Sequence, residues 1–204
     1  MPPVSDARRQ AGEVIAQHAA AIAEGWREAV RSDQEIAGDE RLPDLLLTNQ
    51  VPALLADIAR ALAGGDETTT SDLSIMRRRR GLRFGKLRGL AHYDAAELYR
   101  EFKHLRHEIW GLLRREGDWS RGDAFEVMLA VDQYLDEVIG ASLRGFFETS
   151  ERISRESSET QRVTTREMEA LRRSAAEAPS ASDANAPPPP VVEPPPAAHG
   201  GGRE

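Results

Sequence analysis

The sequence predicts an all-α protein: an antiparallel helical bundle with a long C-terminal helix and a disordered Pro-rich tail. Apolar residues recur at helical spacing along the chain, and no alternating β-branched run lies between turn residues. The eleven aromatic residues all lie between Trp26 and Phe147. We therefore expect a folded domain over residues 1–148, a helical extension over 149–178 and a tail over 179–204. A globin-like arrangement is one form that the bundle could take.

Composition excludes several classes of protein. The 204 residues include no cysteine, which excludes disulfides, thiol nucleophiles and Cys-type zinc sites. No apolar run approaches the roughly 18 residues that cross a bilayer, and residues 1–13 lack the apolar core of a signal peptide. We expect a soluble, cytoplasmic protein with no membrane attachment.

Two helices are predicted in the first third of the chain. The first runs from about Asp6 to Ser32, with an apolar stripe that ends at Trp26 and Val30. The second covers residues 48–63, follows a short turn at residues 42–47, and has Pro52 in its first turn, where the missing amide is not needed.

A third helix is predicted over residues 72–90, after a polar loop at 66–72. Its buried side should carry Ile75, Leu82 and Leu90. Glycines recur every four residues on this helix, at positions 81, 85 and 89. They indicate either a smooth stripe for close packing or merely a weak helix. A helix is weakened because each glycine lowers helix stability by about 1 kcal/mol relative to alanine.

Two further helices complete the prediction. The segment Asp94–Glu97 is a capping box, and the helix that follows should reach about Arg115. The last helix should run over residues 121–178, because that stretch contains no proline. Beyond Phe147 it keeps only a thin apolar seam, which predicts a weak coiled coil and a dimerisation surface at Ile153, Met168 and Leu171.

Proline dominates the end of the chain. Eight of the twelve prolines lie at or after position 179, so this segment cannot bury enough apolar surface to offset chain entropy. Such tails are usually spacers, and a ligand for a proline-binding module is the alternative.

One stretch carries a family resemblance. Matching residues are Gly85, Arg88, Tyr93, Asp94, Leu98, Glu101, Phe102, Leu105 and Arg106, and Asp132 fits within a later segment, Ala130–Glu137. The pattern resembles the N-terminal domain of RsbRD-type RsbT co-antagonist proteins, which also occurs in front of bacterial histidine kinases. The resemblance covers about residues 10–148. The chain departs from the pattern at Phe84, where the family has histidine, and at His92, where it has glycine.

The resemblance implies a non-enzymatic sensory or regulatory module of bacterial signal transduction, in a stress-response or histidine-kinase pathway. Its long last helix would act on a protein partner of the kinase, phosphatase or anti-sigma type, or on a second copy of the chain. No kinase core or phosphate-binding glycine loop follows the module, so we expect its partner to be another polypeptide.

The motif residues favour a structural role. Arg88 and Glu101 lie on neighbouring antiparallel helices and could form a partly buried pair, which sets register more than it adds stability. We therefore expect Arg88, Tyr93, Asp94, Glu101, Phe102, Leu105, Arg106 and Asp132 to hold the fold together rather than to bind a ligand.

Catalysis, metals and cofactors are all disfavoured. Glu101 and His104 have the Glu-x-x-His spacing of di-iron bundles, but that site needs two copies and two further carboxylates. A haem would need a histidine that faces the core, and His18 is the nearest candidate. No Ser-His-Asp arrangement can be assembled. We expect no enzymatic activity, metal or cofactor, and keep a ligand-binding globin-like bundle as an alternative.

The third helix carries a basic island in an acidic chain of net charge −7. It consists of Arg77, Arg78, Arg79, Arg80, Arg83, Lys86 and Arg88. The island could dock an acidic protein partner, or complement acidic groups of the same chain. Nucleic-acid binding is a third reading, which the overall acidity and the lack of interleaved aromatics disfavour.

Overall fold

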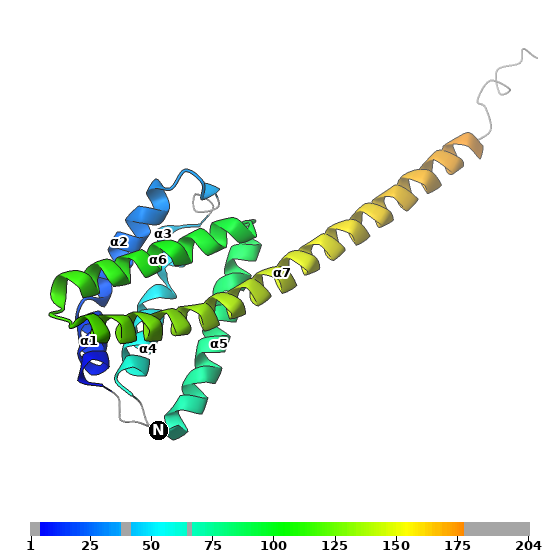
Figure 1. The fold of residues 1–204 in the computed structure, drawn as a ribbon. Coiled ribbons are helices and arrows are strands. Elements are labelled where there is room, and N and C mark those ends of the chain that lie inside the picture. The colour runs from blue at the N-terminus through cyan, green and yellow to red at the C-terminus, as the bar shows by residue number, and fades with distance from the viewer. Residues whose placement is uncertain (1–4, 38–41, 65–66, 178–204) are drawn as a thin grey trace, which may run out of the picture. The chain divides into compact units, whose positions relative to one another are not determined.

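The fold is known from a computed structural model, which describes residues 5–37, 42–64 and 67–177. Most of the described residues are helical and none of them forms a strand, as the sequence predicts. The helices are α1 Asp6–Gln17, α2 Ala19–Ser32, α3 Asp44–Thr48, α4 Val51–Leu62, α5 Glu67–Leu90, α6 Ala95–Glu116 and α7 Arg121–Glu177 (Figure 1). The predicted disordered tail lies outside the described residues.

The chain divides into two units, residues 1–157 and 158–204. The first unit holds the hydrophobic core, to which α1, α2, α4, α6 and the first part of α7 contribute buried side chains. Within the second unit, residues 158–174 of α7 are all exposed. None of the helices in the described part of the chain combines the length and the hydropathy needed to cross a membrane.

The first predicted helix is wrong in one respect, because it is broken at His18. His18 leaves helical geometry with φ −107° and ψ 14°. The break has a tertiary cause. The first half packs on α4, where a Cβ at Gly12 would lie 2.6 Å from the Ala59 carbonyl oxygen, while α2 packs on α6 through Trp26. One straight helix could not follow both neighbours.

Helix α5 also differs from the prediction. It begins at Glu67, so residues 67–71, expected in a polar loop, are helical. Ile75 and Leu90, expected on the buried side, are exposed, and Leu82 is half-buried. The buried side consists instead of Gly81, Phe84, Gly85, Arg88 and Gly89. The apolar pattern misled because this helix is buried through contact at its glycines.

The glycines of α5 pack directly on α7. A Cβ at Gly85 would lie 1.8 Å from the Ser142 carbonyl oxygen, and one at Gly81 would lie 2.7 Å from the Ala141 Cβ. From the other side, a Cβ at Gly145 would lie 2.3 Å from the Leu82 carbonyl oxygen. The structure therefore supports the close-packing reading of the glycine repeat. The small residues of α7 that meet it are Ala141, Ser142, Gly145 and Thr149.

The remaining predicted helices are confirmed. Helix α4 begins after Gln50 with Pro52 in its first turn, and α3 occupies the predicted short turn. Helix α6 starts with the predicted capping box: Asp94 Oδ1 accepts from the Glu97 amide at 2.8 Å, and Glu97 Oε2 accepts from the Asp94 amide at 2.6 Å. Helix α7 covers nearly the whole predicted range, and its last buried residue is Thr149.

Candidate functional site

The centre of the motif is a buried ion pair between α5 and α6. Arg88 Nε lies 3.0 Å from Glu101 Oε2, and both side chains are 0% exposed. Arg88 Nη2 also donates to the Leu47 carbonyl oxygen at 3.0 Å, which ties α3 into the same cluster. The predicted pairing of Arg88 with Glu101 is confirmed. Because breaking such a pair leaves an uncompensated buried charge, it fixes how these helices meet.

Aromatic rings enclose the ion pair. The guanidinium carbon of Arg88 lies 4.0 Å from the centre of the Phe84 ring and 5.8 Å from that of Tyr93. Phe84 in turn contacts Phe102, with ring centroids 5.0 Å apart. Trp26 of α2 donates its indole N–H to the Glu101 carbonyl oxygen at 2.8 Å. Protein atoms therefore fill the surroundings of Arg88, in line with the structural role expected of the motif.

The second half of the motif joins α6 to α7. Arg106 pairs with Asp132 at 3.1 Å and with Asp136 at 2.8 Å, while Leu105 beside it is buried in the core. Burial raises the pKa of Asp132, and the nearby Arg106 guanidinium partly opposes that rise. Arg106 thus holds two carboxylates one turn apart on α7, which places the start of that helix against α6.

The sequence comparison agrees with this geometry. The family model described as "RsbT co-antagonist protein rsbRD N-terminal domain" matches residues 20–161. The chain belongs to the RsbRD N-terminal domain family. This is a family of signalling and regulatory domains of the RsbR type, not a known enzyme family. No curated protein and no solved structure gives a significant match to the chain.

The two departures from the RsbRD N-terminal pattern have different consequences. Phe84 stands where the pattern has histidine, and its ring is buried between Arg88 and Phe102. His92 stands where the pattern has glycine, and it adopts φ 58°. Glycine is favoured in this left-handed region, because it has no Cβ to clash with the backbone. The structure therefore explains the family's glycine as a backbone requirement at the turn between α5 and α6.

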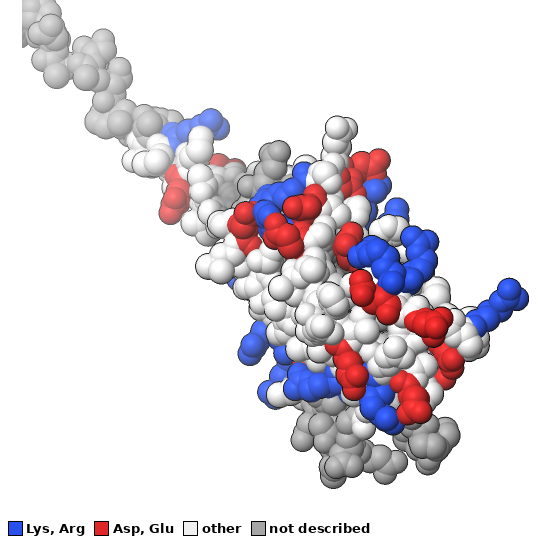
Figure 2. Space-filling model, turned by 90° about the vertical axis from the view of Figure 1, so that its left-hand side faces the viewer, with Lys and Arg blue, Asp and Glu red and all other residues white. Residues whose placement is uncertain are grey.

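Most of the basic island on α5 pairs with acids of the same chain. Arg77 lies 3.0 Å from Glu137, and Arg80 lies 2.8 Å from Asp57. Lys86 lies 3.6 Å from Glu148. Arg88 is fully buried and cannot belong to a docking patch, which corrects its inclusion there. Figure 2 shows a different face, the left-hand side of Figure 1, where blue and red side chains are also interspersed.

Four members of the basic island are exposed, and apart from Lys86, which pairs with Glu148, they are Arg78, Arg79 and Arg83. None of the three has an ion pair within the described part of the chain. These side chains are what remains of the predicted docking patch.

Sequence reasoning missed Asp57, an acid buried on α4. Its side chain is 1% exposed and pairs with both Arg80 and Arg60. Its position between Leu54 and Ile58, on the apolar face of the helix, was the available signal. An acid at such a position needs a buried cationic partner. Arg80, the last of four consecutive arginines on α5, supplies it together with Arg60.

The candidate metal and haem residues do not converge. Glu101 is paired with Arg88, and His104 Nε2 lies 2.7 Å from Asp33 Oδ2. His18 is half-buried at the junction of α1 and α2. Within residues 5–37, 42–64 and 67–177, no group of three or more potential ligands could hold a metal ion.

The predicted dimerisation seam lies on α7. Ile153 is half-buried, whereas Met168 and Leu171 are exposed. Exposed apolar residues at helical spacing are available for contact with another chain.

An apolar cleft of about 430 Å³ lies between the end of α6 and the beginning of α7. Trp110 and Trp119 line it, together with Met128. The indole N–H of Trp119 donates to the Leu113 carbonyl oxygen at 2.7 Å, which closes the turn between the two helices. None of the motif residues lines this cleft.

Proposed function

We propose that the chain is a non-enzymatic input module of a bacterial stress-response or histidine-kinase pathway. Its family supports the regulatory role. In this proposal α7 carries the output, by contact with a protein partner of the kinase, phosphatase or anti-sigma type. The name of the family model points to an RsbT-type kinase pathway as the first to test.

The backbone contact between α5 and α7 is the observation that carries this proposal. Gly85 and Gly145 bring the two helices together with no intervening side chain. Arg88, on the same helix as Gly85, is anchored to α6 and α3. Tightly packed elements move as units rather than deform continuously. A shift of α5 would therefore have to be accommodated by α7.

The position of the seam supports its role as the contact surface. Met168 and Leu171 lie on the same helix that α5 contacts, beyond its last buried residue. We propose that this surface binds either the partner or a second copy of the chain. Nucleic-acid binding is less well supported, because four of the seven basic residues of the island pair with acids of the chain.

Replacing the seam tests the proposal. We expect Ile153→Asp together with Leu171→Asp to weaken binding to a co-expressed RsbT-type or histidine kinase of the same bacterium by at least about tenfold, or to halve the mass of the free chain. Titration calorimetry measures the first effect and light scattering the second. An unchanged mass together with unchanged kinase binding would overturn the role of the seam.

Ser158→Asp is the matched control. At 100° per residue, Ser158 lies on the side of α7 away from Ile153 and Leu171. We expect this exposed residue to tolerate the added charge, with mass and kinase binding as in the unmodified chain. Circular dichroism verifies that all variants keep their helices.

A further inference from the structure

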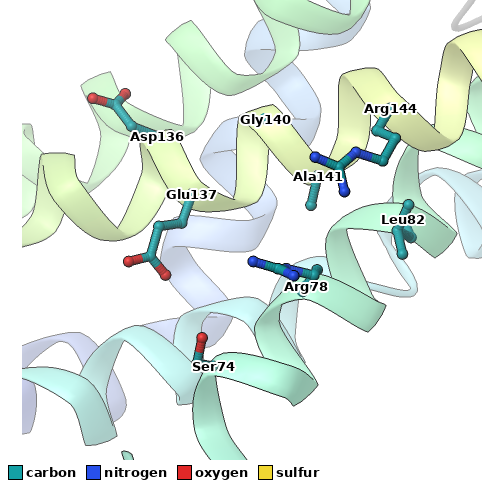
Figure 3. Close-up of a pocket in the computed structure, with 8 residues that line it drawn as sticks. All are labelled: Ser74, Arg78, Leu82, Asp136, Glu137, Gly140, Ala141 and Arg144. Carbon is teal, nitrogen blue, oxygen red and sulfur yellow. The ribbon is translucent and has the colours of Figure 1, made fainter. Parts of the chain in front are cut away.

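A second cleft, of about 350 Å³, lies between α5 and α7 (Figure 3). From α5 it is lined by Ser74, Arg78 and Leu82. From α7 it is lined by a short segment that runs from Asp136 to Arg144. The volume lies within the range typical of small-molecule sites.

The charges around the cleft are unequally compensated. Of its two acids, Glu137 pairs with Arg77 at 3.0 Å and Asp136 pairs with Arg106 at 2.8 Å. Neither Arg77 nor Arg106 lines the cleft. Its own two cations, Arg78 and Arg144, have no ion pair within the described part of the chain. The cleft therefore presents two guanidinium groups that have no ion pair of their own, beside acids that are already paired with Arg77 and Arg106.

The two guanidinium groups come from different helices. Figure 3 shows Arg78 rising from α5 and Arg144 reaching from α7, with Ala141 between them, while the Asp136 carboxylate points away from both. An anion placed between them would be held from two sides. Ser74, half-buried on α5, adds a hydroxyl donor to the same cleft.

The shape of α7 leaves room for such an anion. At Gly81 the two helices touch, with 2.7 Å from a Cβ there to the Ala141 Cβ. At Gly140, which also lines the cleft, a Cβ would meet nothing within 4 Å. Gly140 is thus the one glycine among these contacts whose missing side chain leaves open space rather than permitting close packing.

We propose that this cleft binds a small phosphate-bearing molecule. Guanidinium groups bind phosphate through paired N–H donors, and a tetrahedral phosphate can accept from two arginines and a hydroxyl at once. A single carboxylate needs only one arginine for its two oxygens, so it would leave the second arginine of the cleft without a hydrogen-bond acceptor. The cleft has no aromatic side chain for stacking a base, so the phosphate is the group that is recognised.

Ligand binding at this site would regulate the signalling module of the proposed function, but the binding itself does not depend on that function. A phosphate held by Arg78 and Arg144 would link α5 to α7 a short distance from their glycine contact. Because binding is measured directly on the free chain, it can succeed or fail independently of whether the chain binds a kinase.

Titration calorimetry of the full chain with pyrophosphate and with inorganic phosphate, at constant ionic strength, tests the proposal. We expect saturable binding of one pyrophosphate per chain. Arg78→Gln and Arg144→Gln should each weaken it at least about tenfold, as expected for loss of a charge-assisted hydrogen bond. Arg79→Gln and Arg83→Gln, which remove exposed charges of α5 outside the cleft, should change it less than about twofold.

Gly140→Leu is a second and independent variant. Its side chain extends into open space, so it should occlude the cleft and abolish binding without lowering the unfolding temperature. Binding by this variant as tight as by the unmodified chain would contradict the assigned position of the site.

Three further outcomes overturn the proposal. One is the absence of saturable binding of either phosphate probe. Another is binding of citrate as tight as that of pyrophosphate, which would assign the cleft to carboxylates. The third is an equal loss in the Arg79 and Arg83 variants, together with binding of a short DNA duplex, which would indicate a diffuse phosphate-backbone surface.

Discussion

Arg88 and Arg78 lie on the same helix and have opposite surroundings. Arg88 is fully buried, paired with Glu101 and enclosed by Phe84 and Tyr93. Arg78 is exposed, lines an open cleft and has no ion pair within the described residues. One arginine is part of the core, and the other is available to a ligand.

The comparison shows that position in the fold, not residue type, decides what each cation of α5 does. Arg88 follows Gly85, where the helix is pressed against α7 and covered by α6 and α3. Arg78 precedes Gly81, where the contact between the two helices gives way to the cleft. A buried charge stabilises the fold only through its partner, whereas an exposed one is nearly neutral for stability.

The largest effect should come from Arg88→Met. It leaves the Glu101 carboxylate buried without a counter-ion, which costs roughly 3–5 kcal/mol in the free energy of unfolding. Thermal and urea unfolding, followed by circular dichroism, measure the loss. Arg83→Met, an exposed arginine on the same helix, is the control and should change stability by about 0.5 kcal/mol or less.

Adding Glu101→Leu to Arg88→Met sharpens this test. The double variant removes both charges and should recover part of the lost stability, because no unpaired buried charge remains. Equal stability of the single and double variants would show that the pair contributes through packing rather than through charge.

An intermediate effect is expected at the glycine contact. Gly85→Ala places a Cβ against the Ser142 carbonyl oxygen of α7, and such overpacking typically costs about 1–3 kcal/mol. Gly140→Ala is the matched control on α7, where the Cβ meets open space, and should stabilise the chain by up to about 1 kcal/mol through helix propensity. Denaturant unfolding compares the two, and stabilisation by both would contradict the tight contact.

The smallest effect concerns pH and Asp132. Burial raises its pKa above the ordinary 3.8, so the folded chain binds a proton there more readily than the unfolded chain does. Its contribution to stability is therefore present at low pH and falls as pH rises through the folded pKa. Asp132→Asn removes this contribution, so the free energy of unfolding of the variant relative to the unmodified chain should increase as the pH rises from below 3.8 through the folded pKa.

The slope with pH is what decides this last test. Losing the ion pair with Arg106 changes the free energy of unfolding of the variant by an amount that varies little at pH values above the pKa of Asp132. The contribution from protonation of Asp132, in contrast, changes as the pH passes through that pKa. Unfolding curves across the pH range separate the two. A relative stability that is flat, or that falls with pH, would contradict the raised pKa.

Helix α6 is an element whose bounds and buried face can be predicted from local sequence alone. Its capping box and its apolar stripe are formed by residues that lie three or four positions apart, so start, end and buried face all follow from the sequence. Leu98, Phe102 and Leu105 are buried as their spacing predicts. The Arg88–Glu101 pair could also be anticipated, because the short connection at Tyr93 brings the end of α5 close to the start of α6.

Helices α1, α2 and α5 have features that local sequence alone does not predict. The segment from Asp6 to Ser32 reads as one helix, and only the separate packing partners α4 and α6 require the break at His18. The face of α5 was misassigned because glycine carries no hydropathy signal, although its absent side chain is what permits burial. The cleft at Arg78 and Arg144 joins residues from distant parts of the chain, and no spacing rule could bring them together.

The sequence by itself determined the all-α class, the family, most helix ends and the motif pair, because these depend on contacts within a few turns of the chain. Only the tertiary structure decided which cations are neutralised, which glycines are in contact and where the cleft opens. Those outcomes depend on which helix lies opposite, and the free energy of a charge or a missing side chain is set by the group that faces it.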